Sequence, residues 1–152
     1  MKPYHGEIKI LSSSECIKLL EKSRFGHLAC SIKDEIYLVP ITFVYEDGYI
    51  YSHSKVGKKI EIMRKNSKVC VQVEDVQDFF RWQSVILWGH FEELAGDIAT
   101  MAMRHLIKKI IEKERDQRRS ELEVDFSALL ESSIIFRVKV ERSTGRSEGW
   151  SN

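Results

Sequence analysis

The sequence predicts a mainly β protein in which about six antiparallel strands form a small closed or partly open barrel with few flanking helices. Most connections between the strand-like segments are short, which suits antiparallel pairing. The regular alternation of strands and helices that builds a doubly wound sheet is missing. A barrel is the economical arrangement for such strands, because closure removes the exposed edges of a sheet.

Runs of β-branched and aromatic residues, bounded by turn residues, mark the strands. These runs cover residues 25–32, 36–45, 49–54, 68–74, 82–94 and 134–142. Asp47 and Gly48 predict a tight hairpin between the second run and the third. Residues 75–80 are expected to be a loop. Gly89, in the middle of the long fifth run, predicts a bulge or a barrel corner.

Four helical segments are expected. The first begins after Ser12, which has capping-box spacing with Glu15. The second follows Gly57. The third is the longest, because apolar residues recur at helical spacing over residues 98–114. A weaker helix is expected over residues 127–131.

The length of 152 residues predicts a single domain over residues 1–152, with a core at about 10–142 and a polar C-terminal tail at 143–152. The hydrophobic share of 43% and the charged share of 31% are ordinary for a globular chain. The formal net charge is +1, which gives no overall field to attract nucleic acid or an acidic membrane surface. Neither nucleic acid nor a membrane is therefore expected as a partner.

The sequence also indicates a cytoplasmic protein. No apolar run approaches the roughly 18 residues of a transmembrane helix, and the first ten residues lack the apolar core of a signal peptide. Cys16, Cys30 and Cys70 are widely spaced and odd in number. Because no C-x-x-C pattern occurs, neither a zinc knuckle nor a disulfide framework is expected. Reduced thiols fit the cytoplasm.

The stretch from Tyr49 to Asn66 holds the strongest chemical signal. A strand ends in a short polar segment, and a helix then begins after Gly57 with two adjacent lysines, Lys58 and Lys59. Cations at a helix start are disfavoured by the helix dipole, and unpaired backbone N–H groups point out of the same end. Both facts favour a bound anion, of which phosphate is the usual one. The alternative is a solvated helix start with two surface lysines.

A second candidate site surrounds Pro40. Proline in a strand is confined to edges or bulges, so the backbone groups around it can be free of strand pairing and can hydrogen-bond a planar heterocycle. The alternative is an edge strand that tolerates a proline. At the start of the long strand, Gln83 or Ser84 offers a polar group, and Trp82 or Trp88 offers an aromatic wall. The alternative there is core tryptophan beside surface polar residues.

Other chemistries find little support. No histidine pair has metal-binding spacing, and no serine, histidine and aspartate order is recognisable. Adjacent Glu92 and Glu93 face opposite sides of a strand and cannot act as a pair. No G-x-G-x-x-G occurs, which argues against a Rossmann dinucleotide site. His27 is the one histidine considered as an acid or base, with a structural role as its alternative.

These segments together resemble the flavin-nucleotide-binding proteins related to pyridoxamine 5′-phosphate oxidase. The order and spacing match over roughly residues 10–142. The matching segments are FGHLACSI (25–32), YLVPITFVYEDGYIYSHS (37–54), VGKKIEIMRKNSKVCVQVE (56–74) and WQSVILWGHFEEL (82–94). The resemblance implies a six-stranded antiparallel FMN-binding split barrel, which is usually a homodimer with flavin at the subunit interface.

Carried over position by position, the resemblance implies a set of cofactor contacts. The backbone of Val39, Pro40, Ile41 and Thr42 would meet the flavin ring, and His53 and Ser54 would lie at the phosphate or ribityl end. Lys58 and Lys59 would hold the phosphate. Ser84 occupies the place of a ring-contacting glutamine in the oxidase, with Gln83 as the near alternative. The ten expected cofactor-binding residues are Val39, Pro40, Ile41, Thr42, His53, Ser54, Lys58, Lys59, Gln83 and Ser84.

The resemblance also implies a function. The oxidase's arginine-rich substrate motifs are not found, since Arg142 and Arg146 lie in a segment of different pattern. The chain is more similar to the nitroimidazole-reductase-like branch. The leading hypothesis is an FMN-dependent oxidoreductase with a nicotinamide donor and a small planar acceptor. The alternatives are a non-enzymatic module that stores or senses FMN, and a haem-handling split barrel in which His90 or the C-terminal tail would supply the axial ligand.

Overall fold

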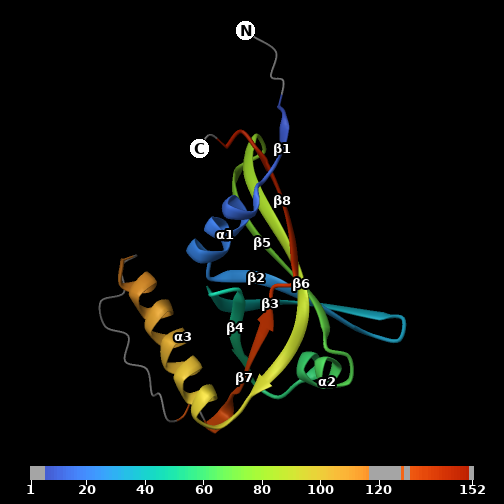
Figure 1. Ribbon diagram of the computed structural model, residues 1–152, viewed down its shortest axis with the longest axis vertical. Helices are drawn as coiled ribbons and strands as arrows, with labels where there is room; N and C mark the ends of the chain where they lie inside the picture. Colours follow the sequence, from blue (N-terminus) through green and yellow to red (C-terminus); the bar gives the residue numbers. More distant parts are fainter. Residues whose placement is uncertain (1–5, 117–127, 129–130, 151–152) are drawn as a thin grey trace.

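The computed structural model describes residues 6–116, 128 and 131–150, and these form eight strands and three helices (Figure 1). The weaker helix expected over residues 127–131 lies mostly outside the described residues. The elements are β1 (Ile8–Ile10), α1 (Ser13–Lys22), β2 (Phe25–Ile32), β3 (Glu35–Glu46), β4 (Tyr49–Ser54), α2 (Lys58–Lys65), β5 (Lys68–Asp78), β6 (Arg81–Leu94), α3 (Gly96–Asp116), β7 (Ile134–Lys139) and β8 (Arg142–Glu148).

Six of the strands close into an antiparallel barrel, as the sequence predicts. Their order is β6-β5-β2-β3-β4-β7, and the ring is closed because β7 also pairs with β6. The first half of β6 pairs with β8, which in turn carries β1, while its second half pairs with β7. The fold class expected from the sequence, mainly β with flanking helices, is therefore confirmed.

Gly89 marks the point where β6 passes from one half of the barrel to the other. Its pairing with β5 continues without a break, so the position is a corner and not a bulge. A Cβ atom built on Gly89 would lie 2.0 Å from the carbonyl oxygen of Lys139. Glycine is required there because a side chain would push the end of β7 away from β6.

Two segments differ from the expectation. Most of the loop expected over residues 75–80 continues as strand, because β5 and β6 remain paired up to Asp78 and Arg81, with an irregularity beside Val76. The expected polar tail contains β8, which pairs with both β6 and β1. Its sequence is almost entirely polar, but its inward positions, Gly145 and Ser147, are small enough to be buried against α1. A strand of this kind lacks the apolar alternation that would reveal it.

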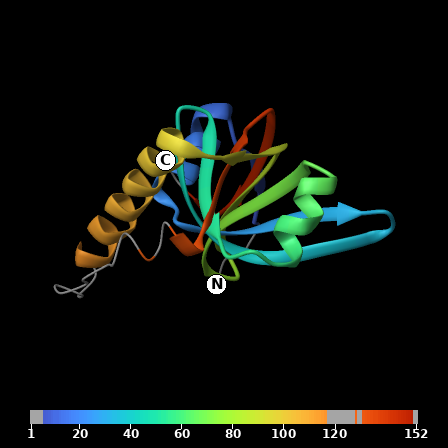
Figure 2. The same ribbon diagram turned by 90° about the horizontal axis from the view of Figure 1, so that it is seen from below.

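The core fills the barrel and is shared by two helices that lie far apart in both views (Figures 1 and 2). From α1 it receives Cys16, Leu19 and Leu20, and from α2 it receives Ile60, Ile62 and Met63. The third helix, α3, packs on the outer side of the barrel. There Ala99, Ala102 and Met103 form a second cluster with Leu94 and Ile135.

Local signals in the sequence are confirmed at several points. Ser12 accepts a hydrogen bond from the N–H of Glu15, and the Glu15 carboxylate accepts one from the N–H of Ser12, which completes the predicted capping box. Asp47 and Gly48 have φ values of 48° and 84°, which suit the tight β3–β4 hairpin. The three cysteines are free thiols. Every helix in the described ranges is too short or too polar to span a lipid bilayer.

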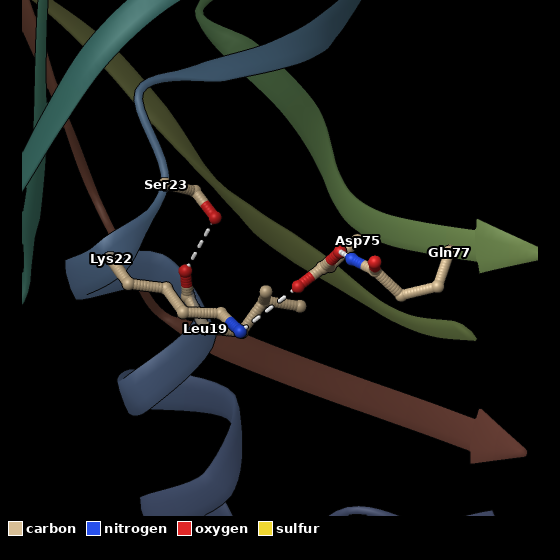
Figure 3. A network of polar contacts seen from close by, with 5 residues as sticks. All are labelled: Leu19, Lys22, Ser23, Asp75 and Gln77. Atoms are coloured by element: carbon tan, nitrogen blue, oxygen red, sulfur yellow. Dashed lines mark hydrogen bonds and ion pairs between the residues drawn. The ribbon is translucent and has the colours of Figure 1, made fainter. Parts of the chain in front are cut away.

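Polar contacts fix the C-terminal end of α1 to the barrel (Figure 3). Ser23 Oγ donates to the carbonyl oxygen of Leu19 at 2.6 Å. Lys22 Nζ lies 3.0 Å from Asp75 Oδ2 on β5, and Gln77 donates to the other oxygen of Asp75 at 2.6 Å. Burial raises the pKa of Asp75, but these hydrogen bonds and the Lys22 charge outweigh it, so the pKa lies below its usual value.

Candidate functional site

The N-terminus of α2 lies beside β3, and Lys58 connects the two. Its ammonium group forms an ion pair with the carboxylate of Glu35 and lies 5.0 Å from the centre of the Tyr37 ring. Gly57, the N-cap residue, has no side chain to accept from the first turn of the helix. The backbone N–H groups of that turn are therefore not capped by their own N-cap residue. Lys58 thus already has an anionic partner within the chain.

Lys59 differs from its neighbour because it is half-buried and makes no ion pair or hydrogen bond with the described residues. Burial lowers the pKa of its ammonium group, and the nearby Cys30 thiol acts in the opposite direction. A partly buried cation without a partner is costly. Lys59 is therefore the side chain in this region most in need of an external anion.

His53 and Ser54 end β4, close to Lys59. Burial lowers the pKa of His53, and the positive charge of Lys59 lowers it further. The imidazole is therefore largely neutral at neutral pH, when it can accept or donate a hydrogen bond. Ser54 Oγ donates to the carbonyl oxygen of Lys55 at 2.8 Å, which shapes the turn leading into α2.

The segment around Pro40 lies along the opening where β3 and β4 separate. Residues 35–42 of β3 pair with β2, and pairing with β4 begins only at Phe43. The other edge of residues 35–42 pairs with no strand in the described part of the chain. This edge includes Val39, Pro40, Ile41 and Thr42, and the carbonyl oxygen of Thr42 accepts a hydrogen bond from Ser52 Oγ on β4 at 2.6 Å. The sequence argument that proline marks unpaired backbone is thus supported by the strand pairing.

Gln83 and Ser84 lie on opposite faces of β6. Gln83 is only 6% exposed and is the register partner of Asp75, whose pKa it helps to lower, so it lies beside the network that holds α1. Ser84 is half-buried and accepts a hydrogen bond from Gln72 at 3.2 Å. Gln72 in turn is the register partner of His27, which is the register partner of Pro40. Of the two candidates, only Ser84 shares a face with the residues around Pro40.

An apolar surface on the β2–β3 hairpin was missed by the sequence reasoning. Phe25, Ile36 and Leu38 are 66%, 78% and 64% exposed, and they lie on the outer face beside Pro40. We call these three residues the hairpin patch. The sequence does contain a signal for this surface. Between Ile36 and Ile41, β3 lacks the alternation of apolar and polar residues that is typical of a strand with one solvent-exposed face. A strand apolar on both faces needs a cover on both.

The remaining candidates are accounted for by neighbouring residues. His90 Nδ1 lies 2.6 Å from Glu141 Oε1, so the histidine considered as a haem ligand has a carboxylate partner. Glu92 pairs with Arg137 on β7, whereas Glu93 pairs with Arg64 on α2, so the two carboxylates have separate partners. Within the described ranges, no three histidine, cysteine or acidic side chains gather as a metal site.

Comparison with known proteins identifies relatives along nearly the whole chain. The family model described as pyridoxamine 5′-phosphate oxidase matches residues 12–147. An uncharacterised protein of Rhizobium meliloti is 33% identical over 98 residues, which are 64% of this chain and 63% of that protein. The chain therefore matches less than two thirds of the length of that curated relative.

Solved structures show the same fold. An FAD-binding protein from Mesorhizobium loti is 34% identical, with a TM-score of 0.73 over 92% of this chain and 97% of the other. A candidate 5-nitroimidazole antibiotic resistance protein from Bacteroides thetaiotaomicron is 18% identical, with a TM-score of 0.72 over 95% and 90%. An FAD- and haem-binding protein from Mycobacterium smegmatis is also 18% identical, with a TM-score of 0.72 over 93% and 74%. The last two likenesses concern the fold alone.

Proposed function

The chain belongs to the pyridoxamine 5′-phosphate oxidase family, and we propose that it is a flavoprotein that binds FMN. The observation that carries this proposal is Lys59, a half-buried cation without a partner among the described residues, at the uncapped start of α2. A terminal phosphate supplies the charge that this position needs, and the N–H groups of the first turn add donors. The FAD-binding relative from Mesorhizobium loti supports a flavin in this fold.

Under this proposal, different residues around α2 contact different parts of the cofactor. Lys59, supported by Lys58, holds the phosphate, and His53 and Ser54 contact the ribityl or phosphate end. At residues 39–42, the edge of β3 that pairs with no described strand would offer backbone groups other than the Thr42 carbonyl, which Ser52 holds, to the polar edge of the ring. Ser84 would offer a hydroxyl on the face of Pro40, whereas Gln83 is buried on the opposite face beside Asp75.

We further propose an FMN-dependent oxidoreductase that takes electrons from a nicotinamide donor and passes them to a small planar acceptor. The bound flavin supplies the redox chemistry, and the chain supplies orientation and charge around it. His53, whose pKa is lowered by burial and by Lys59, would hydrogen-bond the cofactor as a neutral imidazole. The arginine-rich substrate motifs of the oxidase itself are missing from this chain, which favours an acceptor other than a pyridoxine phosphate.

A homodimer completes this proposal. The hairpin patch leaves three large apolar side chains exposed beside the unpaired edge of β3. A second copy of the chain on this face would bury the patch and form the other wall of the flavin site. Exposed apolar surface next to a candidate ligand site is typical of an interface.

The test begins with the cofactor. The purified protein is loaded with flavin, its visible spectrum is recorded, and the released cofactor is identified by chromatography as FMN or FAD. Bound FMN is the expected result. Bound FAD would keep the flavoprotein and overturn the choice of FMN, whereas a Soret band or no bound cofactor would overturn both.

A second assay separates an enzyme from a storage or sensing module. NADH or NADPH is added to the loaded protein with a nitroaromatic compound or a quinone, and nicotinamide oxidation is followed. Steady turnover is expected from the proposed oxidoreductase. A bound flavin that stays oxidised with every pair of donor and acceptor would instead assign the storage or sensing role.

A further inference from the structure

The ion pair between Lys58 and Glu35 joins two elements of the candidate cofactor site. Lys58 is the first residue of α2, and Glu35 is the first residue of β3, directly after the turn of the β2–β3 hairpin. Figure 2 shows this hairpin projecting from the barrel beside α2. The other end of α2 is tied to the same hairpin, because Asn66 Nδ2 donates to the carbonyl oxygen of Ser31 at 2.9 Å. The hairpin therefore supplies a carboxylate to the start of α2.

This carboxylate and the Tyr37 ring together hold the Lys58 ammonium group. Its Nζ atom is paired with Glu35 and lies 5.0 Å from the centre of the ring. The side chains of Lys58 and Glu35 are 51% and 57% exposed. An exposed ion pair of this kind stabilises a fold only weakly. The pair is therefore easily opened, and its main consequence is for any other anion that approaches Lys58.

The two adjacent lysines meet an incoming phosphate in different states. Lys59 is half-buried and makes no ion pair or hydrogen bond with the described residues. Lys58, in contrast, already has the Glu35 carboxylate as its partner. The charge of this carboxylate has the same sign as the charge of a phosphate group. One of the two candidate phosphate contacts is thus occupied by an anion of the chain itself.

We propose that Glu35 is an internal competitor for the phosphate group of the flavin, so that its pairing with Lys58 is an autoinhibitory contact. This inference rests on the proposed function, which assigns the phosphate to Lys58 and Lys59. Carboxylate and phosphate accept the same charge-assisted hydrogen bonds from an ammonium group. An ammonium has three donors, but two anions that share it repel each other. Glu35 therefore weakens the binding of flavins that carry a phosphate.

Riboflavin, which has the same ring and ribityl chain without the phosphate, does not meet this competition. The two flavins therefore separate the effect of Glu35 on the phosphate from any effect on the ring. A positioning role for Glu35 makes the opposite prediction, because a carboxylate that oriented Lys58 toward the phosphate would strengthen FMN binding. The sign of the effect on FMN affinity decides between the two roles.

The test is fluorescence titration of the cofactor-free protein with FMN and with riboflavin, in the original chain and in Glu35→Gln. The substitution keeps the shape of the side chain and removes its charge. Glu35→Gln is expected to bind FMN about two- to fivefold more tightly, the range for an exposed charge pair, and riboflavin with unchanged affinity. Unchanged or weaker FMN binding would overturn the proposal, as would an equal gain for both flavins.

Asp34→Asn is the matched control. It removes the same charge from the neighbouring residue of the hairpin, which is exposed and is not the partner of Lys58. Its gain in FMN affinity is expected to be smaller than that of Glu35→Gln, because solvent and salt screen a charge without direct contact. An equal gain in the two variants would show that only the net charge of the hairpin matters, and would refute competition at Lys58.

The same titrations separate this proposal from the proposed function. Flavin binding with the same FMN affinity in the original chain and in Glu35→Gln would leave the flavoprotein standing and refute the role of Glu35. Failure of every variant to bind either flavin would overturn both. Equal thermal midpoints of the cofactor-free proteins would show that a change in FMN affinity does not come from an altered fold.

Discussion

The two helices that contribute side chains to the barrel core, α1 and α2, differ in the polar contacts at their ends. At α1, Ser12 and Glu15 form a capping box at the first turn. At its other end, Ser23 Oγ donates to the carbonyl oxygen of Leu19 and Lys22 is paired with Asp75 (Figure 3). At α2, the N-cap residue is Gly57, which has no side chain to cap the helix. Lys59 in its first turn has no partner among the described residues.

Both helices contribute equally well-buried side chains to the core, so packing alone does not distinguish them. The difference lies in the polar groups. A helix end whose charges and hydrogen bonds are satisfied internally belongs to the scaffold, whereas one whose groups remain unsatisfied is available to a ligand. The same kind of residue, lysine, is structural at position 22 and a candidate ligand contact at position 59.

The largest expected effect tests the α2 end. Replacing Lys58 and Lys59 together by alanine should weaken flavin binding by about a hundredfold or more, because two charge-assisted contacts to phosphate are lost. The thermal midpoint of the cofactor-free protein should not fall, because the exposed Lys58–Glu35 pair contributes little to stability and the half-buried Lys59 charge has no partner among the described residues. Fluorescence titration with FMN and a thermal melt measure the two quantities.

Lys22→Ala at the α1 end is the control for that experiment. It removes an ammonium group from the other helix and should leave flavin affinity unchanged. If the double variant bound FMN as tightly as the original protein, or if Lys22→Ala weakened binding to the same extent, the contrast between the two helices would be lost.

The next effect belongs to the α1 end. A Cβ atom on Gly145 would lie 2.8 Å from Cys16 Sγ and 2.9 Å from two atoms of Leu11. Gly145→Ala should therefore lower the free energy of unfolding by about 1–3 kcal/mol, the usual cost of overpacking a core. Flavin affinity should not change. Urea denaturation checks this, and Thr144→Ala, an exposed neighbour on the same strand, should be nearly neutral.

A smaller effect is expected at the start of α1. Ser12→Ala removes the side chain that accepts from the N–H of Glu15. Loss of an N-cap costs about 1 kcal/mol, which urea denaturation can detect. Ser13→Ala changes an exposed serine next to Ser12 and serves as the comparison, because Ser14 contacts the Ser12 hydroxyl itself. Equal stability of Ser12→Ala and the original chain would mean that water replaces the cap without loss.

The smallest effect concerns the Lys22–Asp75 pair, which is partly exposed. Asp75→Asn should cost only about 0.5 kcal/mol at pH 7, because solvent screens such pairs. The folded-state pKa of Asp75 is lowered, so the pair's stability is fully present above the ordinary aspartate pKa. It is lost as the pH falls through the folded value.

The measurement for this pair is the free energy of unfolding between pH 6 and pH 2, a range that includes the ordinary aspartate pKa. The difference in free energy of unfolding between the original chain and Asp75→Asn should become smaller as the pH falls. A gap that stayed constant over the whole range would contradict a charge-based role for Asp75.

Much of the barrel could be predicted because its strands carry the apolar alternation that burial on one face requires. β8 was missed because burial there depends on small side chains, Gly145 and Ser147, which give no hydrophobic signal. β8 forms because it pairs with β6 on one side and β1 on the other, and because its small side chains fit against α1. None of these can be read from residues 142–148 alone.

The sequence predicts which residues form the candidate site, and the structure shows what each of them contacts. The sequence places Lys58 and Lys59 together, but only the fold brings Glu35 to one of them and burial to the other. Likewise, the alternation of side chains along a strand assigns Gln83 and Ser84 to opposite faces, but it does not predict which of the two faces is exposed. A cavity beside α3 is lined by residues more than 80 positions apart in the sequence, from Glu46 to Arg137, so no local sequence pattern predicts it.

The unpaired edge of β3 has a cost for the empty protein. Bare backbone donors and acceptors next to Ile36 and Leu38 are a template on which a foreign strand can add itself. A chain in which this edge is uncovered is therefore prone to aggregate with other copies of itself. Under the proposed function, a bound cofactor or a second copy of the chain would shield this edge, and the protein without them would be expected to aggregate more readily.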